Sequence, residues 1–434
     1  MSATLIQRRP REKHHDISAE TAVSPGSWAG LCAASFFLAE INGVTMPFLN
    51  TYLQDSGWRF DSIGSLAALA GLVSLVVHLP GGFLIDRFRH SRVLLAAASL
   101  IVGGAFGFLA LVPATRLWVG VLLVTAAVGK PFFGPLTNAL TLGLVGHNRL
   151  DRALGINQAW NHAGNIAAAL TAMALVSLLP VASVFFAVAA ASVCAASSAL
   201  LIRPSELDER RASGLDQTPV SQMVRLTDLL KDRRLAVLLG AAVLFHLANA
   251  PVMPLVAQKV RHVGGSNGHV AAVVLVAQSV MIPVAILAGL LAQRFGHKRI
   301  LAVGFAVLPV RIALYAVSDD PVVLVAIQAL DGVGAGIFGV TAVAVCAEAT
   351  RGRGRFNALA GTLATAVGMG GAVGPLVSGF VVQNWGFAAA FAAFAIVATV
   401  AAVPFFGWMP EPQSVNELAE LNTPAPACIF AEND

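Results

Sequence analysis

Four charged side chains lie inside long apolar stretches of this sequence, namely Glu40, Lys130, Arg311 and Asp331. A charge at the centre of a membrane helix costs about 2.5–3.5 kcal/mol, so such residues are expected to be paired or to line a polar cavity. Glu40 and Lys130 fall near the middle of their stretches and could pair with each other. Arg311 and Asp331 lie nearer the ends of theirs, and they could also form a pair.

Two interpretations of these charges stay open. In the functional one, Glu40 or Asp331 takes up a proton, while Lys130 or Arg311 binds an anionic solute group or controls the pKa of the carboxylate. Because burial and a neighbouring cation shift the pKa of a carboxylate in opposite directions, breaking such a pair would be tied to proton binding. In the structural interpretation, two ion pairs only hold neighbouring helices together.

Amide and imidazole side chains recur with helical spacing in another apolar stretch. Asn157, Asn161 and Asn165 are four residues apart, and Gln158 and His162 stand beside them. Residues four apart share one face of a helix, so these groups form a polar stripe. Polar contacts between helices are the simpler explanation. The number of polar groups on one face nevertheless favours the wall of a solute cavity.

A second set of polar residues belongs to the later part of the chain. His246 and Asn249 share a helix face just before Pro251, where a helix break could expose backbone carbonyls. Gln278 and Gln328 could complete the opposite wall of the same cavity. His246 by itself is interpreted as an interior histidine, and neither a metal cluster nor a nucleophile–base set is visible. The sequence therefore predicts no metal, no cofactor and no enzymatic activity.

The composition identifies the elements that must position these residues. Of 434 residues, 57% are hydrophobic and 12% are charged, with a mean hydropathy of +0.75. A soluble domain carries about twice that fraction of charge. This excludes a disordered chain and argues against a water-soluble enzyme. The four cysteines are scattered singly, so they predict neither a disulfide framework nor a zinc site.

Windows of about 20 apolar residues, the length that crosses a bilayer, divide the chain into twelve predicted membrane helices. Their predicted limits are 28–50, 62–84, 93–113, 117–146, 153–179, 181–202, 235–257, 269–291, 300–317, 321–347, 357–382 and 387–409. The fold class is thus an all-α membrane protein with two six-helix halves.

A single long polar stretch separates the two sets of six helices. The predicted parts are an N-terminal tail (1–27), a first half (28–202), a central linker (203–234), a second half (235–409) and a C-terminal tail (410–434). The linker and the acidic C-terminal tail are expected to be solvated connectors. Both tails and the linker fall on one side of the membrane, because each half has an even number of helices.

Lysine and arginine residues predict which side that is. Twenty-two of them fall on the side of the tails and linker, against four on the other side. Cytoplasmic loops of membrane proteins carry such an excess, so both termini are expected in the cytoplasm and the protein in the cell membrane. The formal charge of +5 then faces anionic lipid rather than nucleic acid.

The two halves repeat each other at an offset of about 205 residues. Gly, Leu, Arg, Phe, His and Arg recur in step in segments 82–92 and 289–299. The first segment contains Gly82, Asp86 and Arg87 in the pattern G-x-x-x-D-R, and the second places Arg294 at the matching cation.

This loop pattern, the helix number and the repeat resemble the major facilitator superfamily. The resemblance implies two pseudo-symmetric halves with a solute site between them near mid-membrane. It also implies that Gly82, Asp86, Arg87 and Arg294 act as a conformational gate. The chain departs from the family pattern at Arg89, which replaces a glycine, and in the second copy it has no acid at the position of Asp86.

The function expected from the resemblance is secondary active transport of a small organic solute by alternating access, coupled to protons. Export is slightly favoured, although the G-x-x-x-G-P element of drug antiporters is missing from the fifth helix and stands instead at 370–375. Proton-linked uptake of a polar or anionic solute is the alternative, and a non-transporting membrane sensor is the alternative of another class. The expected partners are the solute, protons and lipid, without nucleic acid, for a monomeric protein.

Overall fold

In a computed structural model, residues 23–408 are described except Arg59 and residues 216–223, and the regular elements of the described part are α-helices and 3-10 turns. The first group of long helices runs to residue 201. It comprises α1 (Pro25–Asp55), α2 (Phe60–Phe88), α3 (Ser91–Leu109), α4 (Arg116–Gly129), the 3-10 turn η1 (Lys130–Phe132), α5 (Phe133–Val145), the turn η2 (His147–Arg149), α6 (Leu150–Leu178) and α7 (Ser183–Leu201).

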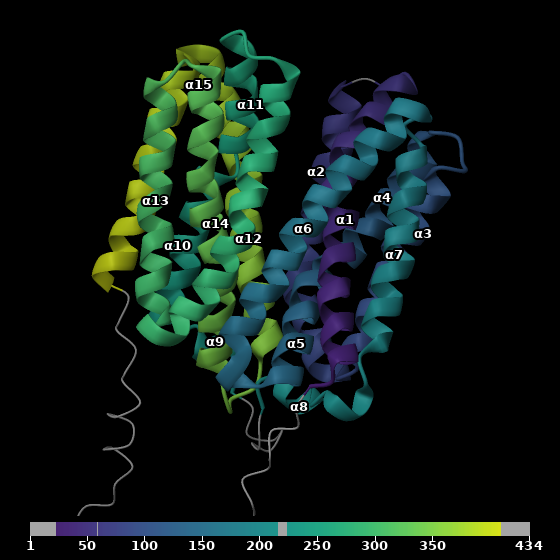
Figure 1. The fold of residues 1–434 in the computed structure, drawn as a ribbon, viewed down its shortest axis with the longest axis vertical. Coiled ribbons are helices and arrows are strands. Elements are labelled where there is room, and N and C mark those ends of the chain that lie inside the picture. Colours follow the sequence, from purple (N-terminus) through teal and green to yellow (C-terminus); the bar gives the residue numbers. More distant parts are fainter. Residues whose placement is uncertain (1–22, 59, 216–223, 409–434) are drawn as a thin grey trace, which may run out of the picture.

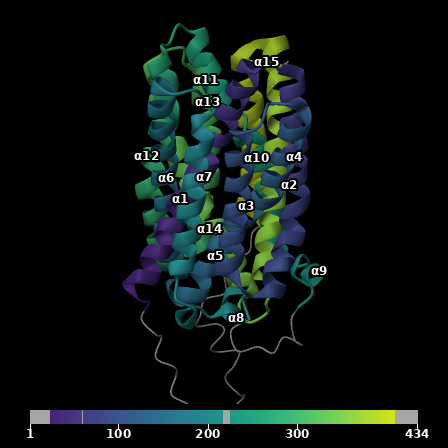
Figure 2. The same cartoon turned by 90° about the vertical axis from the view of Figure 1, so that its right-hand side faces the viewer.

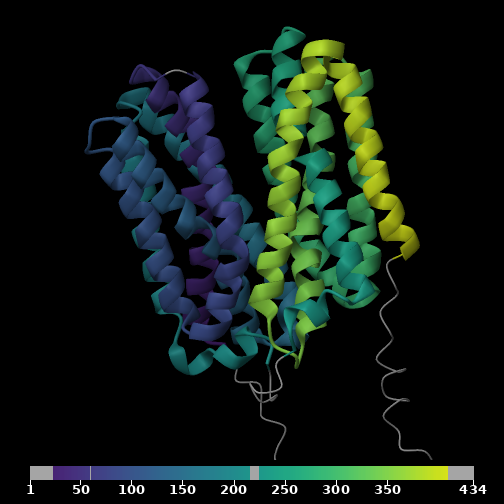
Figure 3. The ribbon, with the colours of Figure 1, turned by 180° about the vertical axis from the view of Figure 1, so that it is seen from behind.

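Short elements of the linker precede the second group of helices. The linker contains the turn η3 (Pro204–Glu206), α8 (Glu209–Ala212) and α9 (Leu226–Leu229). The second group comprises α10 (Arg233–Asn249), α11 (Val252–His262), α12 (Asn267–Phe295), α13 (His297–Val317), α14 (Pro321–Thr350) and α15 (Phe356–Trp408). Gly386, at φ 79°, interrupts α15 and lets the chain reverse into its last helix (Figure 3).

The helices confirm the predicted fold class. Ten described segments are long and apolar enough to cross a membrane. With α1 and α6, which cover the predicted spans 28–50 and 153–179, they account for the twelve predicted helices. The α6 helix carries the stripe of amides. The break predicted near Pro251 is present, since α10 ends at Asn249 and α11 begins at Val252.

The two groups form separate bundles that approach each other at the end carrying α8, here called the linker end (Figure 1). At the opposite end the bundles stand apart, and the view from the side shows the helices running along one common axis (Figure 2). Each bundle has an apolar core of its own. Leu142, Leu150 and Leu154, from the linker end of α5 and α6, belong to the core of the second bundle. The halves therefore pack together at this end.

The described part of the linker is bonded to the helix bundles more closely than the solvated connector that the sequence predicts. The Glu206 carboxylate accepts hydrogen bonds from the backbone N–H of Ser24 (3.0 Å) and from its hydroxyl (2.9 Å), which hold the pKa of that carboxyl below its usual range. Glu209 accepts hydrogen bonds from the backbone N–H (2.9 Å) and hydroxyl (2.8 Å) of Ser91. Two glutamate side chains thus attach the linker to the first half.

The same segment is also bonded to the second half. The N–H groups of Gly354 and Phe356 donate to the carbonyls of Gly214 (3.1 Å) and Ser213 (3.3 Å). Leu215 next to them is fully buried. The described part of the linker therefore bridges both halves at the linker end. The acidic tail from residue 409 onward lies outside the described residues.

Candidate solute site and the contacts that close the linker end

A cavity of about 160 Å³ lies between α1, α5 and α6 and is lined by the middle of α1 and the first halves of α5 and α6. Its lining residues are Ser35, Leu38, Asn42, Phe133, Gly134, Thr137, Asn138, Leu154, Asn157, Gln158 and Asn161. The predicted stripe contributes the last three of these. Ser35, Asn42, Thr137 and Asn138 were not predicted, although Thr137 and Asn138 follow the break at η1 and could have been noticed as polar residues in an apolar helix.

Within the stripe, the amides differ in what they contact. Asn157 is almost fully buried and donates from Nδ2 to the Thr141 hydroxyl at 2.6 Å, so it also serves the packing of α5 against α6. Asn161 accepts a hydrogen bond from Asn165 at 3.5 Å. Asn165 is not among the lining residues. Three amides within one and a half turns of α6 therefore line the cavity, namely Asn157, Gln158 and Asn161.

The other edge of the stripe contacts the second half. Gln158 donates to the backbone carbonyl of Gly339 on α14 at 3.4 Å. His162 Nδ1 and Gln278 Oε1 on α12 are 2.8 Å apart. The stripe is consequently divided, because Asn157 and Asn161 belong to the cavity and His162 to the contact between the halves. Gln278, predicted to face a solute, is engaged in that contact.

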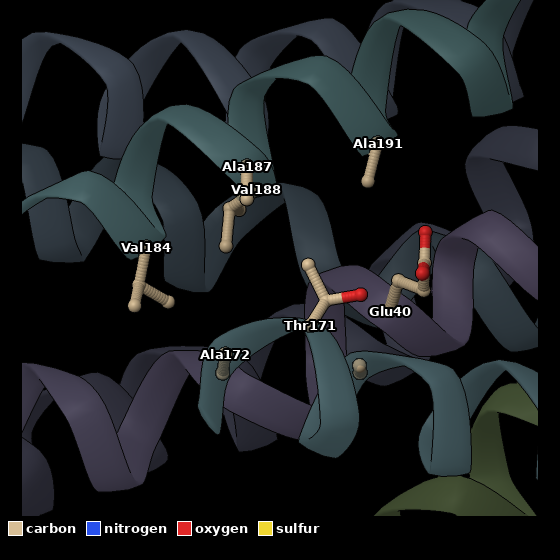
Figure 4. Close-up of a pocket in the computed structure, with 8 residues that line it drawn as sticks. Glu40, Thr171, Ala172, Val184, Ala187, Val188 and Ala191 are labelled. Atoms are coloured by element: carbon tan, nitrogen blue, oxygen red, sulfur yellow. The ribbon is translucent and has the colours of Figure 1, made fainter. Parts of the chain in front are cut away.

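Glu40 occupies a smaller and more apolar pocket of about 30 Å³ between α1, α6 and α7. Thr171 is the other polar lining residue, and alanines and valines form the rest. Figure 4 shows Glu40 and Thr171 facing this space, with Val184 and Val188 of α7 across from them. A carboxylate is thus placed beside the solute cavity but outside its lining.

The suggested pairing of Glu40 with Lys130 is not found. Glu40 faces α6 and α7, and no ion pair between it and Lys130 occurs among the described residues. The Lys130 ammonium instead lies 5.3 Å from the centroid of the Phe106 ring on α3. Lys130 belongs to η1, where the helix is tightened and turns the side chain toward α3. The two side chains therefore have different neighbours within the first half.

Arg311 and Asp331 do form the predicted ion pair. Arg311 is 2% exposed and Asp331 6% exposed, and a guanidinium nitrogen of Arg311 also donates to the Asn249 side chain at 2.6 Å. The cluster joins α10, α13 and α14. Since none of its three members lines the cavity described above, their arrangement supports the structural interpretation.

The remaining predicted residues of the second half are interior. The His246 ring lies 4.8 Å from the Phe338 ring, and its Nδ1 contacts the Ala242 carbonyl at 3.1 Å, as expected for an interior histidine. Gln328 is fully buried one turn before Asp331. Neither lines the cavity between α1, α5 and α6. A solute role for both stays a prediction.

At the linker end, Asp86 reaches across to the second half. It is buried and accepts hydrogen bonds from Asn357 Nδ2 (2.9 Å) and from the backbone N–H of Ala358 (3.1 Å). These groups begin α15, where free N–H groups and the helix dipole favour an anion. Arg87 and Arg294, the two predicted gating cations, are exposed at this end.

A cation near Asp86 comes instead from the other half. The Arg355 guanidinium lies 5.4 Å from the centroid of the Phe83 ring on α2. Arg355 has a positive φ of 71°, which is uncommon for a non-glycine residue. Sequence reasoning counted Arg355 only as a loop charge. The residues around Arg355 in the sequence do not predict that its side chain contacts α2.

The motif glycines allow the two halves to touch backbone to backbone. A Cβ atom on Gly82 would lie 2.2 Å from the carbonyl oxygen of Asn357. A Cβ atom on Gly289 would lie 2.2 Å from the carbonyl oxygen of Asp151. The two contacts are related by the sequence repeat, with α2 against α15 and α12 against α6.

A second pair of glycines lies on the partner helices, α6 and α15, of the same two contacts. A Cβ atom on Gly155 of α6 would lie 2.5 Å from the Ala285 carbonyl oxygen, and one on Gly361 of α15 would lie 2.5 Å from that of His78. Both approaches are too close for any side chain larger than hydrogen. We call Gly82, Gly155, Gly289 and Gly361 the glycine contacts.

Beside the glycine contacts, one histidine joins three helices. His297 Nε2 is 2.9 Å from the Asp151 carboxylate of α6, and its Nδ1 is 3.1 Å from the Glu348 carboxylate of α14. Ionised carboxylates only accept hydrogen bonds, so both contacts together require both ring nitrogens to carry protons. The repeat pointed to His297 through its match with His90, but its acidic partners were not predicted.

Comparison with known proteins decides the family. The model of the MFS_1 like family matches residues 30–393, most of the chain. This protein belongs to the major facilitator superfamily. It is 35% identical over 396 residues to an uncharacterized MFS-type transporter of Mycobacterium tuberculosis, a match covering 90% of this chain and 94% of the relative. Macrolide efflux protein A of Streptococcus pyogenes is 25% identical over 297 residues, 66% of this chain and 70% of the relative.

Solved structures of MFS transporters show the same fold. The structure of FucP in the outward conformation matches with a TM-score of 0.68 at 16% identity, covering 89% of this chain and 99% of that chain. A variant of the E. coli fucose:proton symporter FucP matches with a TM-score of 0.68 at 15% identity, covering 89% and 98%. The chain is thus an MFS-type transporter by family, relatives and fold, and the predicted resemblance is confirmed.

Proposed function

We propose that this MFS transporter moves a small organic solute by alternating access, that protons drive it, and that it works in the direction of export. The observation that carries the proposal is the polar cavity between α1, α5 and α6 beside the contact between the halves. The halves are joined at the linker end and stand apart at the other (Figure 1). Rocking the halves about the level of the cavity would expose it to each side of the membrane in turn.

Glu40 is the proposed proton carrier. An ionised carboxylate among alanines and valines is costly in a membrane, and binding a proton removes that cost. Its pocket shares α1 and α6 with the solute cavity. A change in the Glu40 charge can therefore act on the same two helices that hold the solute.

The direction rests on two considerations. The excess of lysine and arginine on the side of the linker supports a cytoplasmic linker end and cytoplasmic termini in the cell membrane. Similarity to a macrolide efflux protein supports export rather than uptake. The fold match to a fucose:proton symporter keeps uptake as the second candidate, because the same architecture serves it.

The test is transport by purified protein in liposomes that contain a pH-sensitive dye. A proton gradient is imposed, and chemically diverse solutes are added one at a time. Solute-dependent proton movement in the direction opposite to the solute supports proton-driven export, and movement in the same direction supports uptake. If folded protein moves none of the solutes in either direction, the transport proposal is overturned and a sensor role is favoured.

A further inference from the structure

The chemistry of the cavity lining limits what the cavity can hold. Its polar lining residues are uncharged amides and hydroxyls, such as Asn138, Asn161 and Thr137, and no charged side chain among the described residues belongs to the lining. We propose that the cavity binds an uncharged solute that carries hydroxyl or amide groups. This inference rests on the transport function proposed above and narrows its solute.

The charges of the described membrane helices are directed elsewhere. Glu40 faces the separate pocket against α7, and Lys130 is directed to Phe106 of α3. The charge of Arg311 is matched by Asp331 within the second half. A cationic or anionic solute would lose its hydration in the cavity without gaining an ion pair there, which is unfavourable in a low-dielectric interior.

The amides are suited to groups that both donate and accept hydrogen bonds. Each Asn or Gln side chain offers one acceptor and two donor hydrogens, and so complements a hydroxyl or another amide. Asn157 is held in place by Thr141 at 2.6 Å, whereas Asn138 on α5 makes no hydrogen bond to another described residue. Asn138 on α5 and Asn161 on α6 therefore line the same cavity, and both have hydrogen-bonding capacity left for a solute.

The size of the cavity agrees with a small solute. The cavity of about 160 Å³ has room for several water-sized groups, so it can hold a small polar molecule or one polar end of a larger one. Leu38, Phe133 and Leu154 supply the apolar part of the wall. A compact skeleton with several hydroxyl or amide groups would use both kinds of surface.

The test compares matched triples of solutes in the liposome assay. Each triple consists of a neutral alcohol or amide, the primary amine and the carboxylate on one skeleton, for example xylitol, its amino derivative and xylonate, with further triples built on aliphatic and aromatic amides. Uptake or export of each member is measured by mass spectrometry at equal concentration. We expect the neutral member of at least one triple to be moved at least tenfold faster than both charged members.

Two variants make the result independent of overall activity. Asn161→Asp places a carboxylate in the cavity, and we expect preference within the transported triple to shift at least tenfold toward the amine. Asn384→Asp, the same change at an exposed position of α15 outside the lining, is the control and should keep the preference for the neutral member. Preferential transport of a charged member by the unchanged protein, or equal shifts in both variants, would overturn the inference while leaving the transport function intact. Absence of all transport by folded protein overturns both.

Discussion

At the scale of single residues, the charges of this transporter fall into three groups with different surroundings. Glu40 stands alone with a threonine in an apolar pocket, Asp86 is satisfied by the start of α15, and Arg311 is matched by Asp331. Each carboxylate is a different physical case, because an isolated, a hydrogen-bonded and an ion-paired carboxylate respond differently to losing their charge. Substitutions that remove only the charge separate the three.

Replacing Glu40 by Gln keeps the size of the side chain and removes the group that can bind a proton. We expect proton-coupled transport to fall at least a hundredfold, while solute counterflow without a proton gradient continues. The measurement is the dye signal against counterflow in the same liposomes. Glu40→Asp, which keeps the carboxylate, is the control and should retain coupling. Full gradient-driven transport by Glu40→Gln would remove Glu40 from the mechanism.

Replacing Asp86 by Asn weakens the contact that joins the halves at the linker end. Hydrogen bonds to a charged group contribute about 1.5–3 kcal/mol, so a neutral acceptor should shift the balance away from the observed state by roughly tenfold or more. Spin labels at Leu111 and Val317, exposed residues at the opposite end of the two halves, report the change. We expect a larger population of short distances. An unchanged distribution would show that Asp86 does not stabilise this state.

At the scale of helices, contact between the halves depends on α2 against α15 and on α6 against α12. The glycine contacts bring these helices within backbone distance, and the described part of the linker is bonded to both halves beside them. The pairs are related by the sequence repeat. Two helix pairs with the same arrangement, one from each copy of the repeat, therefore close the linker end.

The glycine contacts can be tested with single methyl groups. In Gly155→Ala, the new Cβ atom would lie 2.5 Å from the Ala285 carbonyl oxygen, so α6 and α12 must separate. We expect the linker end to open, seen as a shorter distance between labels at Leu111 and Val317. Gly104→Ala, with nothing within 4 Å of its Cβ position, is the control. Because alanine favours a helix by about 1 kcal/mol over glycine, the control should be at least as stable. Identical label distances in both variants would argue against the glycine contacts.

The buried pair between α13 and α14 distinguishes structure from function. Asp331→Asn leaves the Arg311 charge unmatched in the interior, which costs about 3–5 kcal/mol, so we expect a large loss of folded protein. The double variant Arg311→Leu with Asp331→Leu removes both charges and should recover most of the folded yield. Thermal unfolding and transport are measured on both. A folded double variant that has lost all transport would instead give the pair a functional role.

At the scale of the whole molecule, the described structure has the linker end closed and the other end apart, and the fold matches FucP in the outward conformation. The charge distribution of the loops predicts which side of the membrane the closed end faces, namely the cytoplasm. If the linker end is cytoplasmic, this state is closed toward the cytoplasm, and the halves stand apart on the outer side.

The orientation is checked by labelling cysteines in intact cells. A cysteine introduced at Leu111 should react with a membrane-impermeant maleimide added outside, because it lies at the end opposite the linker. A cysteine introduced by Arg210→Cys in α8, and the native Cys428 of the C-terminal tail, should react only after the membrane is permeabilised. Reaction of Arg210→Cys in intact cells, with Leu111→Cys protected, would reverse the proposed topology.

Helix positions, the family, the polar stripe of α6 and the pair of Arg311 with Asp331 could be predicted from the sequence. They depend on local patterns, because apolar length predicts a membrane helix and a four-residue spacing predicts a shared face. The repeat extended this to Gly82 and Gly289. These features need no knowledge of how distant helices pack.

Only the tertiary structure decided which groups meet. Asp86 lies 271 residues from Asn357, and His297 is bonded to acids on two other helices. The direction of Lys130 toward α3 and of Glu40 toward α7 separates two charges that the sequence placed at one depth. Depth along a helix follows from counting residues, but the facing of a side chain toward one neighbour or another follows from the packing of helices, which no local pattern encodes.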